Sequence, residues 1–233
     1  MARRAPNVGV VIAGGGRGRR VGGVLPKQFL SLGGVPLLVR TLRVFAGMSE
    51  VGAIVVVVPG DQISRAERLI RRWGIRKVVA VVAGGVERQA SVRVGLGAFR
   101  RKPRIVLVHD AVRPFVGREI VRQVITKAAV AGGALVGVPV TDTITEADRR
   151  GRAVRTLRRE HLWAVQTPQG FRYGLLVRAH REAERSGFVG TDDASLVQRL
   201  GYPVRIVQGE ASNIKITTRR DLERAKRGLV GRS

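Results

Sequence analysis

Short runs of aliphatic residues recur along the chain, separated by longer stretches in which apolar positions return with a helical period. The aliphatic runs are continuous rather than alternating, which is typical of strands covered on both faces. We predict strands at residues 8–13, 53–58, 78–83, 105–108, 134–138 and 204–207. The intervening stretches predict helices with one apolar face at 35–45, 61–73, 118–130 and 175–185.

Strand and helix therefore alternate through most of the sequence. This alternation predicts the α/β class, with a Rossmann-like, mostly parallel sheet flanked by helices. We expect a single domain over residues 1–233, because neither a linker nor an internal repeat interrupts the pattern.

One polar stretch, residues 141–162, breaks the alternation. Its two β-prone halves flank a turn-like centre at 147–152. We therefore predict a β-hairpin arm that projects from the domain. Because its apolar residues are too few for a core of its own, we expect the arm to pack on a second subunit, with a surface flap as the alternative.

The charge of the chain is strongly positive, with 43 Lys and Arg against 17 Asp and Glu and a net charge of +26. Such a surface attracts nucleotides, nucleic acid or anionic lipid. The basic residues are spread along the whole chain, however, so we favour a general preference for arginine as the explanation of the excess. Because no groove-reading helix or RNA motif is visible, a nucleic-acid-binding protein is only a distant alternative.

Cysteine is absent, which excludes a disulfide scaffold, a thiolate metal site and a cysteine nucleophile. The longest uncharged stretch, 128–141, is too short for a membrane span and contains glycine and proline. The first apolar run is too short for a signal sequence. We therefore expect a cytoplasmic protein that does not associate with a membrane.

The first candidate site follows the first predicted strand, where the chain reads GGGRGRR and then reaches Lys27. Glycines let a backbone approach a ligand and direct N–H groups at phosphates, and the cations suit a triphosphate. The segment matches neither the dinucleotide fingerprint nor the P-loop. A tight turn with solvated arginines would give the same pattern.

A second candidate site is the segment VHDAVRPF. Its Asp110 follows a buried strand, at the end where open α/β sheets bind ligands, and Arg113 is suited to hold an anion. Taken alone, Asp110 is better explained as a turn former or a helix cap. We interpret His109 as a packed histidine rather than a general base, because no partnered Ser or Cys motif accompanies it.

Three further segments carry polar groups that suit a nucleotide or a phosphate. GGVERQAS offers Arg88 and Ser91 after two glycines, and in LWAVQTPQGF we expect an extended backbone that presents Thr167 ahead of a helix. SNIKIT places Lys215 in a short β-like run. Cations converge, carboxylates are few, and the signatures of hydride transfer and acyl hydrolysis are missing. The set favours a site for two anionic substrates.

Several segments also occur in a characteristic order: GGGRGRR with PKQFL, AGGVERQASV, VLVHDAVRPF, VPVTDTI, RREHLWAVQTPQGF, GTDDASLV and SNIKITT. In this order the chain resembles the 2-C-methyl-D-erythritol 4-phosphate cytidylyltransferases of the non-mevalonate isoprenoid pathway, over about residues 8–225. The resemblance implies a nucleotidyltransferase-type fold and a homodimer. It also implies transfer from CTP to methylerythritol phosphate, with release of pyrophosphate and with Mg²⁺ carried mainly by the CTP phosphates rather than by a protein metal site.

The resemblance also assigns residues. The arm, with Thr143 and Arg159, would reach across the dimer to complete the neighbouring site. The implied catalytic residues are Arg20, Lys27, Arg159 and Lys215. The implied CTP-binding residues are Ala13, Gly14, Gly15, Gly16, Gly85, Arg88 and Ser91, and the implied acceptor-binding residues are Asp110, Arg113, Thr143 and Thr167.

The chain departs from the family pattern in two places. Val86 stands where many relatives have an acidic residue, so recognition of the base would rely on backbone groups. The glycine loop begins Ala-Gly-Gly where relatives often have Pro-Ala-Ala, which adds backbone freedom.

The alternative to this family is a ribitol 5-phosphate cytidylyltransferase, because such an enzyme has similar motifs. The LWAVQTPQGF and GTDDASLV segments favour methylerythritol phosphate.

Overall fold

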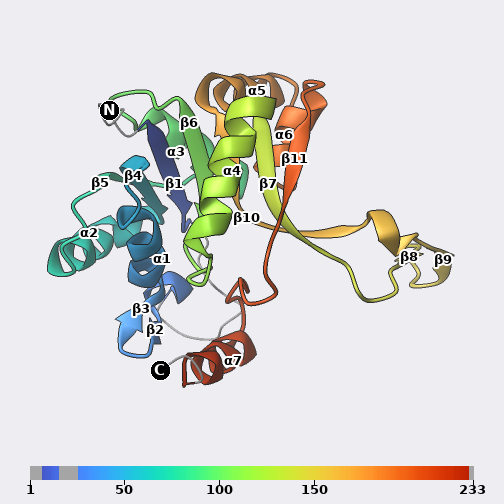
Figure 1. Ribbon diagram of the computed structural model, residues 1–233, viewed down its shortest axis with the longest axis horizontal. Helices are drawn as coiled ribbons and strands as arrows, with labels where there is room; N and C mark the ends of the chain where they lie inside the picture. The colour runs from blue at the N-terminus through green and yellow to red at the C-terminus, as the bar shows by residue number, and fades with distance from the viewer. Residues whose placement is uncertain (1–6, 16–25, 231–233) are drawn as a thin grey trace.

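Seven strands form one central sheet in the computed structural model, which describes residues 7–15 and 26–230 (Figure 1). The strand order is β11-β7-β10-β6-β1-β4-β5. Only β10 runs antiparallel to its neighbours, which confirms the predicted mostly parallel sheet. The bounds are β1 Val8–Ala13, β4 Val51–Val58, β5 Val78–Ala83, β6 Ile105–Asp110, β7 Gly133–Pro139, β10 Trp163–Arg172 and β11 Val204–Gln208.

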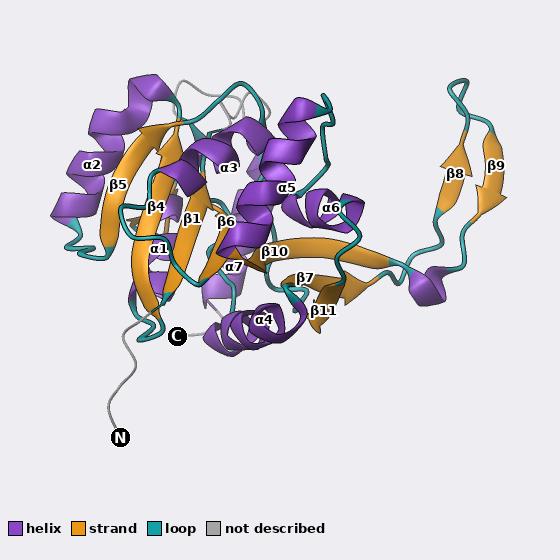
Figure 2. Ribbon diagram, turned by 90° about the horizontal axis from the view of Figure 1, so that it is seen from above, coloured by secondary structure: helices purple, strands orange, loops and turns teal. Residues whose placement is uncertain are grey.

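Helices cover both faces of this sheet (Figure 2). One face packs on α1 (Leu37–Ala46), α2 (Ile63–Arg72) and α4 (Arg118–Ala131), and the other on α3 (Arg88–Gly97), α5 (Tyr173–Arg185) and α6 (Asp193–Arg199). Successive β1 side chains alternate between the two cores, since Val10 and Ile12 enter the first and Val11 the second. Both faces are apolar for this reason, and the strands read as unbroken aliphatic runs.

A smaller layer lies beside the carboxyl end of the sheet. It contains η2 (Lys27–Phe29), the short pair β2 (Ser31–Leu32) and β3 (Val35–Pro36), and α7 (Arg219–Val230). β2 and α7 contribute to a third apolar cluster centred on Leu32, Leu37 and Ile216, whereas Phe29 of η2 and Val35 of β3 pack in the first core. Another short helix, η3 (Gly60–Gln62), precedes α2. Among the described residues, no helix combines the length and the apolar character that crossing a membrane requires.

The six predicted strands and four predicted helices all occur, with ends that shift by a few residues. The pattern missed β10, because its polar residues and Pro168 are unusual in a central strand. It also missed α3, α6 and α7. The β-like run expected around Lys215 was wrong. Ile214–Thr217 has no regular structure, although the Ile216 N–H donates to the Val112 carbonyl over 3.0 Å.

The predicted hairpin arm is confirmed. It consists of β8 (Thr145–Ala147) paired antiparallel with β9 (Ala153–Thr156), followed by η4 (Arg159–His161). Figure 2 shows the hairpin standing well away from the sheet and its helices. All seven residues of β8 and β9 are exposed. Nothing in the described chain therefore covers the arm.

Candidate functional site

Four parallel strands end at the same edge of the sheet. The register pairs Ala13 with Asp110 and with Val57, and Val58 with Ala83. The loops that follow β1, β5 and β6 therefore meet there, at the edge where open α/β sheets bind ligands. They enclose a cleft of about 260 Å³, lined by Ala13, Gly14, Gly15, Lys27, Gln28, Gly85, Val86, Glu87, Arg88, Ser91, Asp110, Val112 and Lys215.

Glycines form one wall of this cleft because a serine side chain occupies the space beside them. A Cβ atom at Gly15, or at Gly84 just behind the wall, would lie only 2.8 or 2.7 Å from the Ser91 Oγ, so a larger residue there would require the Ser91 side chain to move. The Ser91 hydroxyl donates to the Gly85 carbonyl over 3.3 Å. This wall thus exposes backbone groups to a ligand at close range.

The other end of the cleft is a cluster of cations around one carboxylate. Lys215 Nζ lies 3.0 Å from Asp110 Oδ2, Arg113 Nε 3.4 Å from the same oxygen, and Arg88 Nε 3.7 Å from Oδ1. Burial by itself would raise the pKa of Asp110, but Lys215, Arg88 and Arg113 outweigh it and lower the pKa to about 2. The carboxylate is ionised at neutral pH, and the cluster still has an excess of positive charge.

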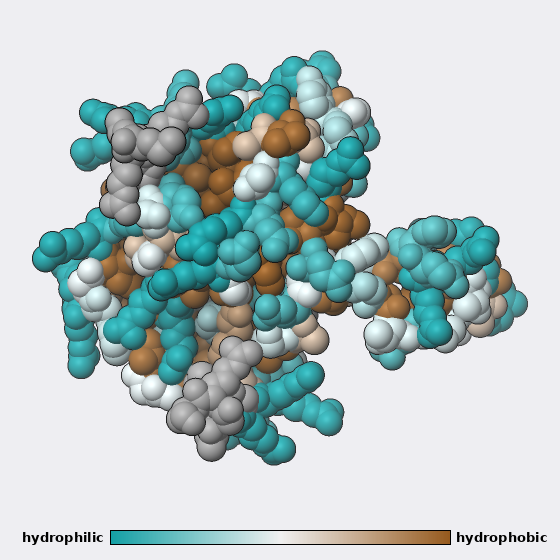
Figure 3. Space-filling model, viewed as in Figure 1, coloured by the Kyte–Doolittle hydropathy of each residue, from teal (hydrophilic) through white to brown (hydrophobic). Residues whose placement is uncertain are grey.

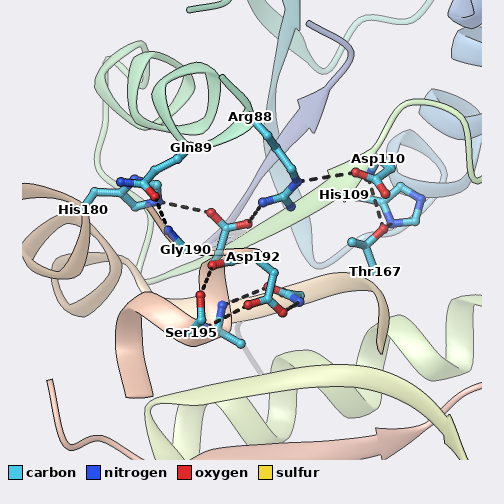
Figure 4. Close-up of polar contacts among 12 residues, drawn as sticks. Arg88, Gln89, His109, Asp110, Thr167, His180, Gly190, Asp192 and Ser195 are labelled. Atoms are coloured by element: carbon cyan, nitrogen blue, oxygen red, sulfur yellow. Dashed lines mark hydrogen bonds and ion pairs between the residues drawn. The ribbon is translucent and has the colours of Figure 1, made fainter. Parts of the chain in front are cut away.

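Thr167 hydrogen-bonds both to the backbone of Asp110 and to the side chain of His109 (Figure 4). The Thr167 hydroxyl accepts from the Asp110 backbone N–H over 3.1 Å and lies 3.0 Å from His109 Nδ1. His109 Nε2 is 3.0 Å from the Arg113 carbonyl, which can only accept, so Nε2 carries the proton and Nδ1 accepts from Thr167. Burial lowers the pKa of His109 to about 4. The ring is fully buried and packs against Phe45, as expected for a packed histidine.

Arg113 connects this cluster to the loop that carries Lys215. Its Nη1 donates to the Asn213 carbonyl over 2.7 Å, and the Asn213 amide donates to the Thr167 carbonyl over 3.0 Å. Neither Arg113 nor Thr167 lines the cleft itself. In this chain their visible contacts position Asp110 and the Lys215 loop.

The remaining predicted residues fall into two groups. Lys27 lines the cleft from η2. Gly16 and Arg20 lie outside the described residues. Thr143 and Arg159 belong to the arm, where Arg159 Nη1 donates to the Thr141 carbonyl over 2.8 Å. Neither arm residue lines the cleft of its own chain. The described site residues outside the arm therefore lie together at the cleft, whereas the arm residues lie apart from it. We call the part of the chain outside the arm the body.

Two polar residues at the site were missed by the assignment from sequence. The amide of Gln28 is buried and donates to the Gly14 carbonyl over 2.9 Å, which ties the Lys27 segment to the glycine loop. Asp193 is buried and lies 2.7 Å from the Arg88 guanidinium. Both occur in the quoted segments PKQFL and GTDDASLV, but spacing alone does not show which side chains turn inward.

A doubly covered, mostly parallel sheet with a cationic, glycine-walled cleft at its carboxyl edge defines an α/β fold of the nucleotidyltransferase type. The family model for 2-C-methyl-D-erythritol 4-phosphate cytidylyltransferase matches residues 8–230. The chain belongs to this family.

Individual relatives agree with this assignment. The chain is 46% identical over 226 residues to the enzyme of that name from Pelotomaculum thermopropionicum, covering 97% of this chain and 95% of the relative. It is 47% identical to that of Geobacillus thermodenitrificans, covering 97% and 98%. Among solved structures, the Thermus thermophilus cytidylyltransferase superposes with a TM-score of 0.76 at 37% identity, covering 96% and 98%. The 4-diphosphocytidyl-2C-methyl-D-erythritol synthase of Anaerococcus prevotii gives 0.84 at 27% identity, covering 96% and 95%.

Proposed function

We propose that this chain transfers a cytidylyl group from CTP to 2-C-methyl-D-erythritol 4-phosphate. The products are 4-diphosphocytidyl-2-C-methyl-D-erythritol and pyrophosphate, in the non-mevalonate route to isoprenoid precursors. The observation that carries this proposal is the family match from residue 8 to residue 230. The relatives named above bear the methylerythritol phosphate name, which favours that acceptor over ribitol 5-phosphate.

The reaction joins two anions. An oxygen of the acceptor phosphate attacks the α-phosphorus of CTP, and the bond from that phosphorus to the bridging oxygen breaks as pyrophosphate leaves. The nucleophile is already an oxyanion, so the protein need not remove a proton. The buried, neutral His109 is consistent with this requirement, because its ring nitrogens are both occupied by other groups.

The main task of the site is therefore to let two phosphates approach each other. Lys27, Arg88 and Lys215 line the cleft and would offset the repulsion. Asp110 holds the Lys215 ammonium at 3.0 Å, so this charge is positioned before substrate binds. We include Arg20 with Lys27 as the pair that stabilises charge on the triphosphate, as the family resemblance implies.

We assign the glycine wall to the cytosine and ribose. Ala13, Gly14, Gly15 and Gly85 offer backbone groups there, and the family resemblance assigns Gly16 to the same ligand. Val86 is fully exposed at the rim of the cleft. An aliphatic side chain in that position adds no hydrogen bond, so the base would be read mainly by backbone atoms.

We propose Mg²⁺ as the cofactor, carried by the triphosphate. Among the described residues, no group of three or more His, Asp or Glu side chains is arranged as a metal cage. The carboxylates that line the cleft are Asp110 and Glu87, which suits an ion held mostly by phosphate oxygens and water with one carboxylate at most. When bound, Mg²⁺ would neutralise phosphate charge.

We also propose a homodimer in which the arm of one protomer reaches the cleft of the other. The arm exposes Ile144 and Val154, and Val165 is exposed near its base. Thr143 and Arg159 contribute nothing to the cleft of their own chain, so a role in the reaction requires a second copy.

We place the enzyme in the cytoplasm, which suits a chain without cysteine.

The test is a pyrophosphate-release assay. Purified protein receives CTP and Mg²⁺ with methylerythritol phosphate or with ribitol 5-phosphate, and parallel reactions replace CTP with ATP, GTP or UTP. We expect release with CTP and methylerythritol phosphate, and its loss in Lys215→Ala. Release with ribitol 5-phosphate alone would overturn the acceptor, and release with neither would overturn the activity.

A further inference from the structure

The Arg88 guanidinium lies between two carboxylates that belong to different parts of the molecule (Figure 4). Its Nε is 3.7 Å from Asp110 Oδ1 at the cleft, whereas its Nη1 is 2.7 Å from Asp193 Oδ2 in α6. Both carboxylates are buried, and the electrostatic attraction between opposite charges strengthens as their separation falls. The attraction to Asp193 is therefore the stronger of the two. Asp193, rather than Asp110, thus fixes the guanidinium.

The Asp193 carboxylate is itself held in place. Only 1% of the side chain is exposed, and its second oxygen lies 3.1 Å from His180 Nε2 in α5. His180 is equally buried, and Asp193 is its only polar partner among the described residues, because His180 Nδ1 has none. Among the described residues, the imidazole therefore makes its polar contact with the Asp193 carboxylate alone.

The helix that carries Asp193 is also anchored to the sheet. Gln169 in β10 donates to the Asp192 carboxylate over 2.7 Å and accepts from the Ala194 N–H over 3.0 Å. Asp192 in turn accepts from the Ser195 N–H over 2.9 Å and caps the helix. These bonds fix the backbone on both sides of Asp193 without touching the cleft.

We infer that Asp193, oriented by His180, is a positioning residue that holds the Arg88 guanidinium at the cleft for the nucleotide phosphates. This inference rests on the proposed function for the identity of the nucleotide. With Nη1 on Asp193 and Nε facing Asp110, the guanidinium is held at the cleft that Arg88 lines. A phosphate bound in the cleft would meet a positive charge that is already positioned.

The opposing hypothesis is that Asp193 only stabilises α6. The two hypotheses predict different effects of Asp193→Asn on CTP binding. Removing the charge leaves the shape of the side chain but releases the guanidinium, so the Kd for CTP with Mg²⁺ should rise about tenfold or more. Isothermal titration calorimetry without acceptor measures this Kd directly.

A double-mutant cycle shows whether Asp193 acts through Arg88. If it does, CTP binding in the Arg88→Ala/Asp193→Asn variant should be no weaker than in Arg88→Ala alone. The matched control is Val197→Ala, which removes buried apolar contacts from the same helix and changes no charge. We expect it to lower the melting temperature and to leave the CTP Kd within about twofold of wild type.

A second pair of variants addresses the case in which Asp193→Asn does not fold. His180→Gln keeps an N–H donor toward Asp193 and should retain CTP affinity. His180→Leu removes the donor and should raise the Kd for CTP about fivefold. Equal affinity in the Gln and Leu variants overturns the inference. So does an unchanged Kd in Asp193→Asn, or independent, additive losses in the double-mutant cycle.

These outcomes separate the inference from the proposed function. The Kd for CTP is measured without acceptor, so the positioning effect is visible even if no pyrophosphate forms with methylerythritol phosphate. Conversely, an active wild-type enzyme whose Asp193→Asn variant binds CTP normally would retain the proposed function and lose the positioning role.

Discussion

Phe171 of β10 and Val154 of β9 are both apolar residues on strands, yet their surroundings are opposite. Phe171 is fully buried between the sheet and its helices, whereas Val154 is 61% exposed on the arm. The arm stands off the body and presents some apolar atoms among its hydrophilic ones (Figure 3). The body is thus held by its own core, and the arm has none.

The charged groups differ in the same way. Asp110 is buried among three cations, and its environment lowers its pKa to about 2. In the arm, Arg155 pairs with Glu146 and Arg152 with Asp148, but the arginine side chains are about 70% exposed. Exposed pairs of this kind contribute little to stability because water and salt screen them. The comparison teaches that the body determines its own geometry, whereas the hairpin of the arm has no packed core to fix its position.

The largest expected effect lies in the body. Lys27→Ala should lower kcat by about 10²- to 10³-fold, with a smaller rise in KM for CTP, because its charge acts most on the transition state. Steady-state kinetics with CTP and methylerythritol phosphate measure both constants. Near-normal turnover would remove Lys27 from the catalytic set.

The two apolar sites test the difference in burial. Phe171→Ala should destabilise the protein by about 3–5 kcal/mol, since it leaves a cavity that the packed core cannot close. Val154→Ala, the control on the arm, should change the free energy of unfolding by less than about 0.5 kcal/mol. Urea unfolding at a low protein concentration compares them. Similar losses at both sites would show that the arm is as well packed as the body.

His109 supplies a pH test of the body. Its pKa is about 4 in the folded chain against an ordinary 6.5, so the unfolded chain binds more protons between these values. The contribution to stability is therefore fully present above pH 6.5 and is lost as the pH falls through 4, by about 3 kcal/mol in total. His109→Gln should flatten this part of the curve. Urea unfolding at pH 7 and 4.5 checks it, and parallel curves for the two proteins would contradict it.

The arm gives the smallest expected effect on chemistry. Arg159→Ala should lower activity about 10²-fold, mainly through the acceptor. If sites are shared between protomers, mixing it with Lys27→Ala should restore about a quarter of wild-type activity, because half of the dimers are mixed and each has one intact site. Native mass spectrometry, which separates the two homodimers from the mixed dimer by mass, shows whether mixed dimers form. An absence of rescue in confirmed mixed dimers would count against the shared site.

Much of the fold was predictable because it depends on a pattern that extends over many residues. Every aliphatic run became a strand, since strands buried on both faces admit few polar residues. β10 escaped prediction because its burial comes from neighbours on either side, β6 and β7, that are distant in sequence. Likewise, Lys215 was found from its motif and not from local structure, which is a loop rather than a strand.

The candidate site shows the same division. The sequence by itself determined the alternation of strand and helix, the glycines and cations at strand ends, the projecting hairpin and the family. Only the tertiary structure decided which charges meet: that Arg88 lies between Asp110 and Asp193, that His109 is turned inward, and that Arg113 supports the Lys215 loop. Periodicity is a local property that the chain carries everywhere, whereas an ion pair depends on the packing of elements that are far apart along it.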